Sequence, residues 1–266
     1  MNTVTNIRIT TAVKTNASLY KQVEDAFSVL SQLESIQNVQ IIKRRKLTIN
    51  QLFQRDTIPL IVFESSGPKL YFTPDTPIYF HLDTVKVKLH MMKQHKMPVL
   101  IEMLDEITTG FKTFNFIDGT MGFGRDTYLI LKHYQQANVY AIEQNPLIHY
   151  VISEGMKRYL TEDELSRIHY INDDYHHWIE QHPEMIDILY LDHMFEQTLE
   201  EDGRMGELSR NIETHAEVKS VSQFKYLIVK AYYKSEIFKK FNTIQCIRKS
   251  TKTHYGLRMN QDYQYE

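Results

Sequence analysis

The sequence predicts an α/β fold, with a parallel β-sheet in the larger C-terminal part and a smaller α/β unit ahead of it. From Phe111 onward, short apolar runs alternate with segments of helical spacing, which is typical of strands joined by crossover helices. A glycine-rich turn within residues 116–126 follows the first of these runs and opens the first helix. A basic helical stretch, Thr84–Glu106, separates the two parts.

Length and composition restrict the class of protein. The chain has 266 residues, 42% of them hydrophobic, and a net charge of −2, which suits a globular protein with a normal core. It has no apolar run long enough to span a membrane and no secretory signal. Its one cysteine, Cys246, excludes an internal disulfide and is expected in the core. We therefore expect a cytoplasmic protein whose RNA partner, if it has one, meets a local basic patch.

The first part of the chain alternates strand and helix patterns. β-branched runs predict strands, helical spacing predicts two helices, and Ser65–Pro68 is a strong turn signal. Asn16 precedes the longer helix and can cap it. The expected strands are Ile7–Val13, Val39–Ile42, Leu60–Phe63 and Leu70–Phe72, and the expected helices are Leu19–Leu33 and Asn50–Gln54.

The connecting stretch Thr84–Glu106 is expected to be helical, with a break near Pro98 because proline does not continue a helix. It is basic, with Lys86, Lys88, His90, Lys93, His95 and Lys96. The sequence thus predicts three regions: an N-terminal α/β domain over residues 1–82, a helical connector over 83–110 and the main domain over 111–266.

The main domain has the strand–helix alternation of a Rossmann-like sheet. No internal repeat or low-complexity tract interrupts it. The expected strands are Phe114–Ile117, Asn138–Glu143, Ile168–Ile171, Ile186–Leu191, Tyr226–Lys230 and Thr243–Ile247, and the expected helices are Arg125–His133 and Pro146–Tyr159.

The glycine-rich turn has the features of a nucleotide site. Gly122 and Gly124 let the backbone turn tightly and approach a ligand closely. A dinucleotide turn would carry a third glycine where this chain has Thr127, and Asp118 would repel a pyrophosphate. A carboxylate suits a cationic ligand instead. The ammonium and sulfonium groups of S-adenosylmethionine (SAM) meet that requirement.

Two further acids are expected beside this turn. Glu143 ends the next strand and could accept hydrogen bonds from both ribose hydroxyls of a nucleoside. Asp173 follows the third strand and could accept one from the adenine amine. Because parallel strands end at the same edge of a sheet, we expect these acids and Asp118 to line one crevice. A dinucleotide site or a structural turn is the alternative.

The fourth strand ends in Asp192-His193-Met194-Phe195, which predicts the catalytic edge. An acid followed by an aromatic residue can bind a target amine and stack on its base, and alignment of the amine provides much of the catalysis. Asp192 and Phe195 fit these roles, unless they are a strand cap and a core residue. Lys230 ends the next strand and contacts either substrate or solvent.

Other polar clusters carry weaker predictions. His176, His177 and His182 match no zinc-ligand spacing, and no metal is expected. Lys43–Lys46 is either a solvated loop or a phosphate contact in an RNA groove.

The sequence of the glycine-rich turn resembles that of a known protein family. Asp118–Asp126 is similar to the segment D-A-T-A-G-L-G-R-D of the RsmJ-like class I SAM-dependent methyltransferases, which methylate guanine N2 in small-subunit rRNA. The similarity continues through Glu143, Asp173 and Val229-Lys230, and 191–195 resembles the family's L-D-P-M-F with His193 in place of proline. His90–Lys93 is similar to its basic H-R-R-K run. The resemblance implies a cofactor site that also includes Gly119, Thr120, Arg125, Asp126 and Gln144.

These observations predict a SAM-dependent methyltransferase that acts on an exocyclic amine of an RNA base. The resemblance implies guanine N2 of rRNA as the position. A small-molecule methyltransferase and a non-catalytic protein that keeps the SAM fold are the alternatives, the second because His193 replaces a proline. The sequence does not indicate an oligomeric state.

Overall fold

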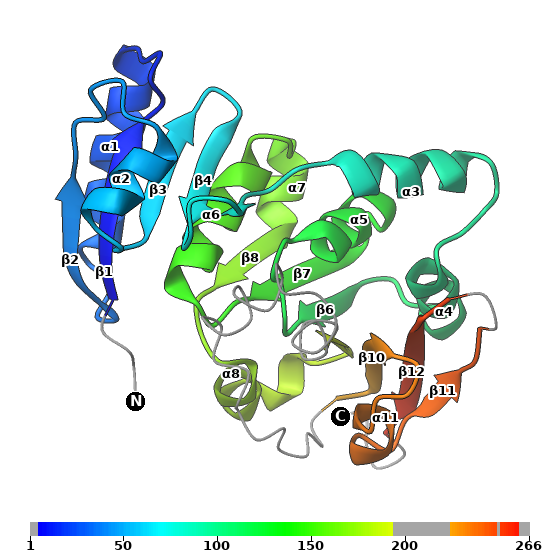
Figure 1. Cartoon of the computed structure of the whole chain (residues 1–266). Coiled ribbons are helices and arrows are strands. Elements are labelled where there is room, and N and C mark those ends of the chain that lie inside the picture. Colours follow the sequence, from blue (N-terminus) through cyan, green and yellow to red (C-terminus); the bar gives the residue numbers. More distant parts are fainter. Residues whose placement is uncertain (1–4, 194–223, 249–250, 261–266) are drawn as a thin grey trace. The chain divides into compact units, whose positions relative to one another are not determined.

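The computed structural model describes residues 5–193, 224–248 and 251–260. The chain divides into two compact units (Figure 1). The first unit is Met1–His81 with Pro146–Tyr159, and the second unit is Leu82–Asn145 with Leu160–Glu266. In the described part of the chain, none of the helices has the length and apolar character needed to cross a membrane.

The first unit is built on a five-stranded sheet in the order β2-β1-β3-β4-β5. β1 is parallel to both β2 and β3, whereas β3, β4 and β5 are antiparallel neighbours. The strands are β1 (Thr5–Thr11), β2 (Ile36–Ile41), β3 (Leu60–Glu64), β4 (Gly67–Tyr71) and β5 (Pro77–Ile78).

Helices of the first unit begin where the sequence offers caps. α1 (Ala17–Leu30) starts after Asn16, whose side chain accepts a hydrogen bond from the Leu19 N–H. α2 (Ile49–Arg55) starts with a reciprocal Thr48–Gln51 capping box. α6 (Pro146–Lys157) joins this unit from a distant part of the chain and packs against β4 and β5.

The second unit is built on a seven-stranded sheet in the order β11-β12-β10-β9-β6-β7-β8. The five neighbouring strands β10, β9, β6, β7 and β8 are parallel, and β12 pairs antiparallel with β10 and β11. The strands are β6 (Phe114–Asp118), β7 (Ala137–Ile142), β8 (Ile168–Ile171), β9 (Ile188–Asp192), β10 (Tyr226–Tyr232), β11 (Ile244–Cys246) and β12 (Thr253–Met259).

Helices cover both faces of this sheet (Figure 1). On one face, Trp178 and Phe238 from two helices pack with Leu189 and Val229 of the strands. On the other, the Tyr134 hydroxyl after α5 donates to the Ile101 carbonyl of α4. The helices are α3 (Asp83–Lys93), α4 (Val99–Ile107), α5 (Arg125–His133), α7 (Glu162–Arg167), α8 (Tyr175–Gln181) and α11 (Ile237–Lys240), with a 3-10 turn η1 (Pro183–Met185).

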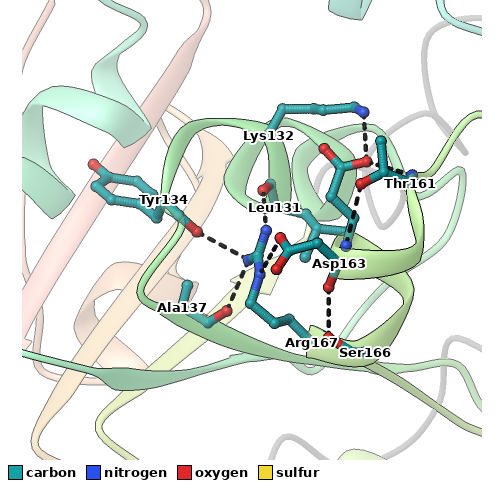
Figure 2. A network of polar contacts seen from close by, with 9 residues as sticks. Leu131, Lys132, Tyr134, Ala137, Thr161, Asp163, Ser166 and Arg167 are labelled. Atoms are coloured by element: carbon teal, nitrogen blue, oxygen red, sulfur yellow. Dashed lines mark hydrogen bonds and ion pairs between the residues drawn. The ribbon is translucent and has the colours of Figure 1, made fainter.

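A polar network holds α7 against the end of α5 and the start of β7 (Figure 2). The Arg167 guanidinium donates to the carbonyls of Tyr134 and Ala137, each at 3.1 Å, and to that of Leu131 at 3.4 Å. Lys132 reaches Glu164 at 2.6 Å. The Arg167 bonds thus satisfy backbone carbonyls at the end of α5 and the start of β7.

The Rossmann-like α/β class predicted from the sequence is confirmed, with three corrections in the second unit. β12 is an additional strand inserted between β10 and β11. β10 continues past Lys230 to Tyr232. The expectation that Cys246 lies in the core is wrong: Cys246 is exposed because β11 is an edge strand, on which Ile244 is 84% exposed.

Candidate active site

The candidate site lies where the order of the second sheet reverses. From β6 the chain proceeds outward through β7 to β8 and then returns to β9 on the other side of β6. Ligands of open α/β sheets bind outside the carboxyl ends of the strands at such a switch point. Here β6 ends at Asp118 and β9 ends at Asp192. The two acids predicted for cofactor and substrate thus come from adjacent strands.

The glycine turn between β6 and α5 has the conformation that its glycines predict. Gly122 has φ 49° and Gly124 has φ 66°, a left-handed region that L side chains rarely adopt. The turn is held by the Met121 N–H, which donates to the Ile142 carbonyl of β7 at 2.9 Å. At Gly119, an added Cβ would lie 2.7 Å from the Leu191 side chain, so a larger residue would force neighbouring side chains to shift.

Asp118 is buried beneath this turn, with 2% of its surface exposed. Its carboxylate accepts hydrogen bonds from the Thr120 N–H at 3.2 Å and from the Thr127 hydroxyl. Burial raises the pKa of Asp118 to about 7, although both donors oppose the shift. A nearby cation would favour the ionised form of this group.

Glu143 follows β7 and faces the same turn. Its two carboxylate oxygens accept from the Gly122 N–H at 3.1 Å and from the Asn145 N–H at 2.9 Å. Burial raises the pKa of Glu143, partly offset by these two bonds. Each oxygen keeps a further lone pair for a ligand. Gln144 is exposed, and its carbonyl, like that of Glu143, accepts from the Asn172 amide.

Asp173 follows β8, is half-buried and already holds a partner. Its carboxylate binds the His177 ring at 2.8 Å, and this bond raises the pKa of His177. The other oxygen accepts from the Asp174 N–H. Asp173 is therefore placed at the expected edge, where an approaching amine would share it with His177.

A series of ionic contacts occupies the edge that the sequence predicts to be catalytic. The Lys230 ammonium lies 2.6 Å from Asp192 and 2.9 Å from Asp126. Lys88 of α3 contacts the other oxygen of Asp126 at 2.6 Å. The Tyr190 hydroxyl also donates to Asp126 at 2.8 Å. Among the described residues, the side-chain donors that hold Asp126 thus come from α3, β9 and β10.

The pKa values of Asp126 and Lys230 in these ionic contacts are shifted in opposite directions. Burial disfavours the charged form of Asp126, yet Lys230 and Lys88 outweigh it and hold its pKa well below the usual range. Burial likewise disfavours the charged form of Lys230, yet Asp126 and Asp192 raise its pKa above the ordinary value. Lys230 is consequently a permanent cation at neutral pH.

His193 is held where the resembling family carries a proline. Its N–H donates to the Lys230 carbonyl at 2.8 Å, which extends the ladder between β9 and β10. Its ring is buried near Phe241, at 5.8 Å between ring centroids. A proline has no N–H with which to form this bond. In this chain, a hydrogen bond thus fixes the backbone after Asp192, where the family has the rigid ring of proline.

The structure describes some of the other residues predicted for the site and leaves Phe195 undescribed. The Thr120 hydroxyl accepts from the Asp192 N–H at 2.7 Å and so joins the turn to the catalytic edge. The Arg125 guanidinium lies 4.8 Å from the centroid of the Phe123 ring. Phe195 lies outside the described residues. Among the residues that are described, no three His, Cys, Asp or Glu side chains are grouped as metal ligands.

Sequence reasoning does not identify three members of the site: Thr127, Tyr190 and Lys88. Thr127 occupies the position at which a dinucleotide turn has glycine, and this departure is its only signal. Tyr190 is a polar residue within an apolar run. Lys88 is one of several basic residues of its helix, and only packing distinguishes it from the others.

Comparison with known proteins shows the family to which the chain belongs. The family described as "Putative SAM-dependent methyltransferase" matches residues 70–202, half of the chain. The chain is 26% identical to ribosomal RNA small subunit methyltransferase J of Psychrobacter arcticus over 176 residues, which are 62% of this chain and 56% of that protein. It is 33% identical to the protein of the same name from Hahella chejuensis over 85 residues, 32% of each chain.

These curated relatives are thus matched over about half of their length or less. Among solved structures, a SAM-dependent methyltransferase of Neisseria gonorrhoeae aligns over 97% of both chains, with a TM-score of 0.55 and 15% identity. At that identity the likeness concerns the fold alone.

Proposed function

Because the chain belongs to this family of SAM-dependent methyltransferases, we propose that it transfers a methyl group from SAM to an exocyclic amine of an RNA base. The names of its partial relatives favour guanine N2 in small-subunit rRNA. The observation that carries the proposal is the meeting of an acid-lined glycine turn with the ion-paired Asp192 at one switch point.

The residues at the turn fit SAM. Asp118 is buried with a raised pKa, so a ligand that carries positive charge gains by ionising it. The Glu143 oxygens keep lone pairs toward which ribose hydroxyls can donate. Asp173 would accept from the adenine amine, and Gly119, Gly122, Gly124 and the flanking Thr120, Arg125 and Gln144 would complete the cradle. SAM, when bound, supplies a methyl group on a cationic sulfur.

Asp192 and Lys230 would have different roles beside the substrate. The target nitrogen gains a methyl group and loses a proton, so it needs an acceptor beside it. Lys230 cannot accept a proton, because its raised pKa keeps it charged. Asp192 is the acceptor, and the hydrogen bond of its N–H to Thr120 fixes its backbone. Phe195 would stack on the base, and Asp126 would hold Lys230 in place.

A strained basic turn in the first unit supports RNA as the substrate. Arg45 and Lys46 have φ values of 45° and 63°, and the Leu47 N–H closes the turn on the Arg44 carbonyl at 2.8 Å. This geometry favours Asn-Gly, and non-glycine residues in it cost about 1–2 kcal/mol each. Two exposed basic side chains held in this way suit contact with phosphates.

We further propose that residues 1–82 form an RNA-docking module, that residues 83–110 connect it to the rest of the chain, and that residues 111–266 form the methyltransferase domain. A ribosomal substrate would place the enzyme in the cytoplasm.

The direct test is methyl transfer from radiolabelled SAM to total RNA of a strain that lacks this protein. We expect labelling by the native chain and none by Asp192→Asn, while both bind SAM equally in titration calorimetry. Equal loss of SAM binding in Asp192→Asn and Gly124→Ala would refute the role given to Asp192. Labelling of a small molecule but not of RNA would refute the substrate class. SAM binding without any transfer would refute the enzyme.

A further inference from the structure

We infer that α3 is an RNA-docking helix whose seating also sets the position of Lys230. This inference rests on the proposed function, because it concerns how the same site receives its RNA. The exposed basic residues and Lys88 lie on different sides of α3, so docking and positioning can be tested separately.

The solvent face of α3 carries a basic stripe beside an apolar one. Val85 and Met92 are buried and mark the inward face. Lys86, His90 and Lys93 are exposed and follow one another at the i, i+4, i+7 spacing that aligns side chains along a helix. Beside them at i, i+4 spacing lie Val87, which is 59% exposed, and Met91, which is 39% exposed.

This charge is concentrated in a chain that is acidic overall. The net charge of the chain is −2, yet residues 84–96 contain four lysines, two histidines and no acid. Lys96 and His95 continue the exposed basic surface past the end of α3. A local patch of this kind attracts a polyanion, and phosphate contacts provide most of the affinity for nucleic acid.

Lys88 points away from this surface and into the site. It lies on the flank of α3 that packs against α5, and its ammonium contacts Asp126 at 2.6 Å. Asp126 in turn contacts Lys230 at 2.9 Å, and Lys230 contacts Asp192 at 2.6 Å. Alternating charges therefore run without interruption from the docking helix to the proton acceptor.

The geometry makes Lys88 and Asp126 positioning residues rather than catalytic ones. Both oxygens of Asp126 are bound by groups that come from α3, β9 and β10. A shift of α3 on RNA binding would move Lys88, change its hold on Asp126 and so reorient Lys230. The site would be assembled fully only when RNA is seated.

The docking half is tested by the double variant Lys86→Glu with Lys93→Glu, compared with Lys112→Glu. Lys112 is an exposed lysine that precedes β6, at the opposite edge of the sheet from the site. We expect the double variant to bind rRNA fragments at least about ten-fold more weakly, with a log–log salt slope smaller by about one to two. SAM affinity should be unchanged in both variants, which also shows that they fold.

An unchanged RNA affinity and salt slope in the double variant would overturn docking on α3, even if the native chain methylates RNA. If the native chain neither binds nor methylates RNA, the proposed function fails first, and the basic stripe would fit an acidic protein instead. The two failures are therefore distinguishable.

The positioning half is tested by Lys88→Met at saturating RNA. We expect kcat to fall at least about ten-fold while KM for RNA and Kd for SAM stay within error, and Lys88→Arg to restore much of kcat because it keeps the charge. A KM effect with kcat unchanged, or equal loss in Lys88→Arg and Lys88→Met, would overturn this half.

Discussion

Lys230 and Asp192 are directly opposite each other on adjacent parallel strands, and their side chains form an ion pair at 2.6 Å. Strand register therefore places this ion pair, without help from a loop. A shift of one residue between β9 and β10 would turn one of the two side chains to the other face of the sheet. The N–H of His193, which extends the same ladder, stabilises this register.

Removing the positive charge of Lys230 should greatly slow methyl transfer and leave SAM binding intact. In Lys230→Met, Asp126 and Asp192 would face each other across a buried site, and the pKa of Asp126 would rise because Lys230 is a main cause of its lowering. We expect kcat to fall by about 10²–10³-fold, as for the loss of one preorganised electrostatic contact, with Kd for SAM within about three-fold. Lys230→Arg should retain part of the activity. A comparable loss of SAM affinity in Lys230→Met would contradict this division of roles.

SAM affinity should increase with pH through the titration of Asp118. Its pKa is about 7 in the free protein, so at about pH 6 the group is mostly neutral and must lose a proton when a cation binds. Kd should therefore fall by up to about ten-fold from pH 6 to pH 8 and then level off. Calorimetry in buffers of different ionisation enthalpy should detect the released proton. Asp118→Asn is the control, and the same pH dependence in that variant would show that another group titrates.

Substituting Gly124 should harm the cofactor site more than the fold. Gly124→Ala places a Cβ at φ 66°, at a cost of about 1–2 kcal/mol, and puts that Cβ where a ligand approaches the turn. Gly110→Ala is matched, because Gly110 also has positive φ, 87°, and a Cβ there meets nothing within 4 Å. Both variants should lose similar stability in urea unfolding, but only Gly124→Ala should lose SAM affinity. Equal SAM affinity in the two would remove Gly124 from the site.

Arg167→Met should destabilise the second unit and leave the chemistry intact. Arg167 satisfies three carbonyls near the end of α5 (Figure 2), and bonds from a charged donor contribute about 1.5–3 kcal/mol. We expect a loss of about 2 kcal/mol, measured as a lower urea midpoint, with SAM affinity unchanged under native conditions. Lys239→Met removes an exposed pair with Glu236 and should leave the midpoint where it is.

The placement of much of the candidate site could be predicted because its residues follow apolar strands. Asp118, Glu143, Asp173 and Asp192 each end or follow a strand whose period is readable in the sequence, and parallel strands share one carboxyl edge. Helix α5 is similarly predictable, and it begins and ends where expected. α7 also has a signal in the sequence, a Thr161–Glu164 capping box, but it is not among the helices predicted above.

The remaining features depend on tertiary packing. The bond between Lys88 and Asp126 joins residues 38 positions apart, and no local pattern distinguishes Lys88 from its basic neighbours. β12 contains threonine, histidine, glycine and arginine and forms a strand because β10 and β11 hold it between them. For the same reason Cys246 is exposed, since insertion of β12 leaves β11 at the sheet edge.

The membership of α6 in the first unit affects any attempt to separate or exchange the two units. The chain passes through the first unit twice, and α6 contributes an apolar surface to it, with Gly155 so close to Phe80 that an added Cβ would lie 2.8 Å away. A fragment starting at residue 83 would carry α6 without the strands that cover it, and we expect it to aggregate. Recombination at a single junction would likewise leave each product incomplete, so the two units are expected to have been inherited together.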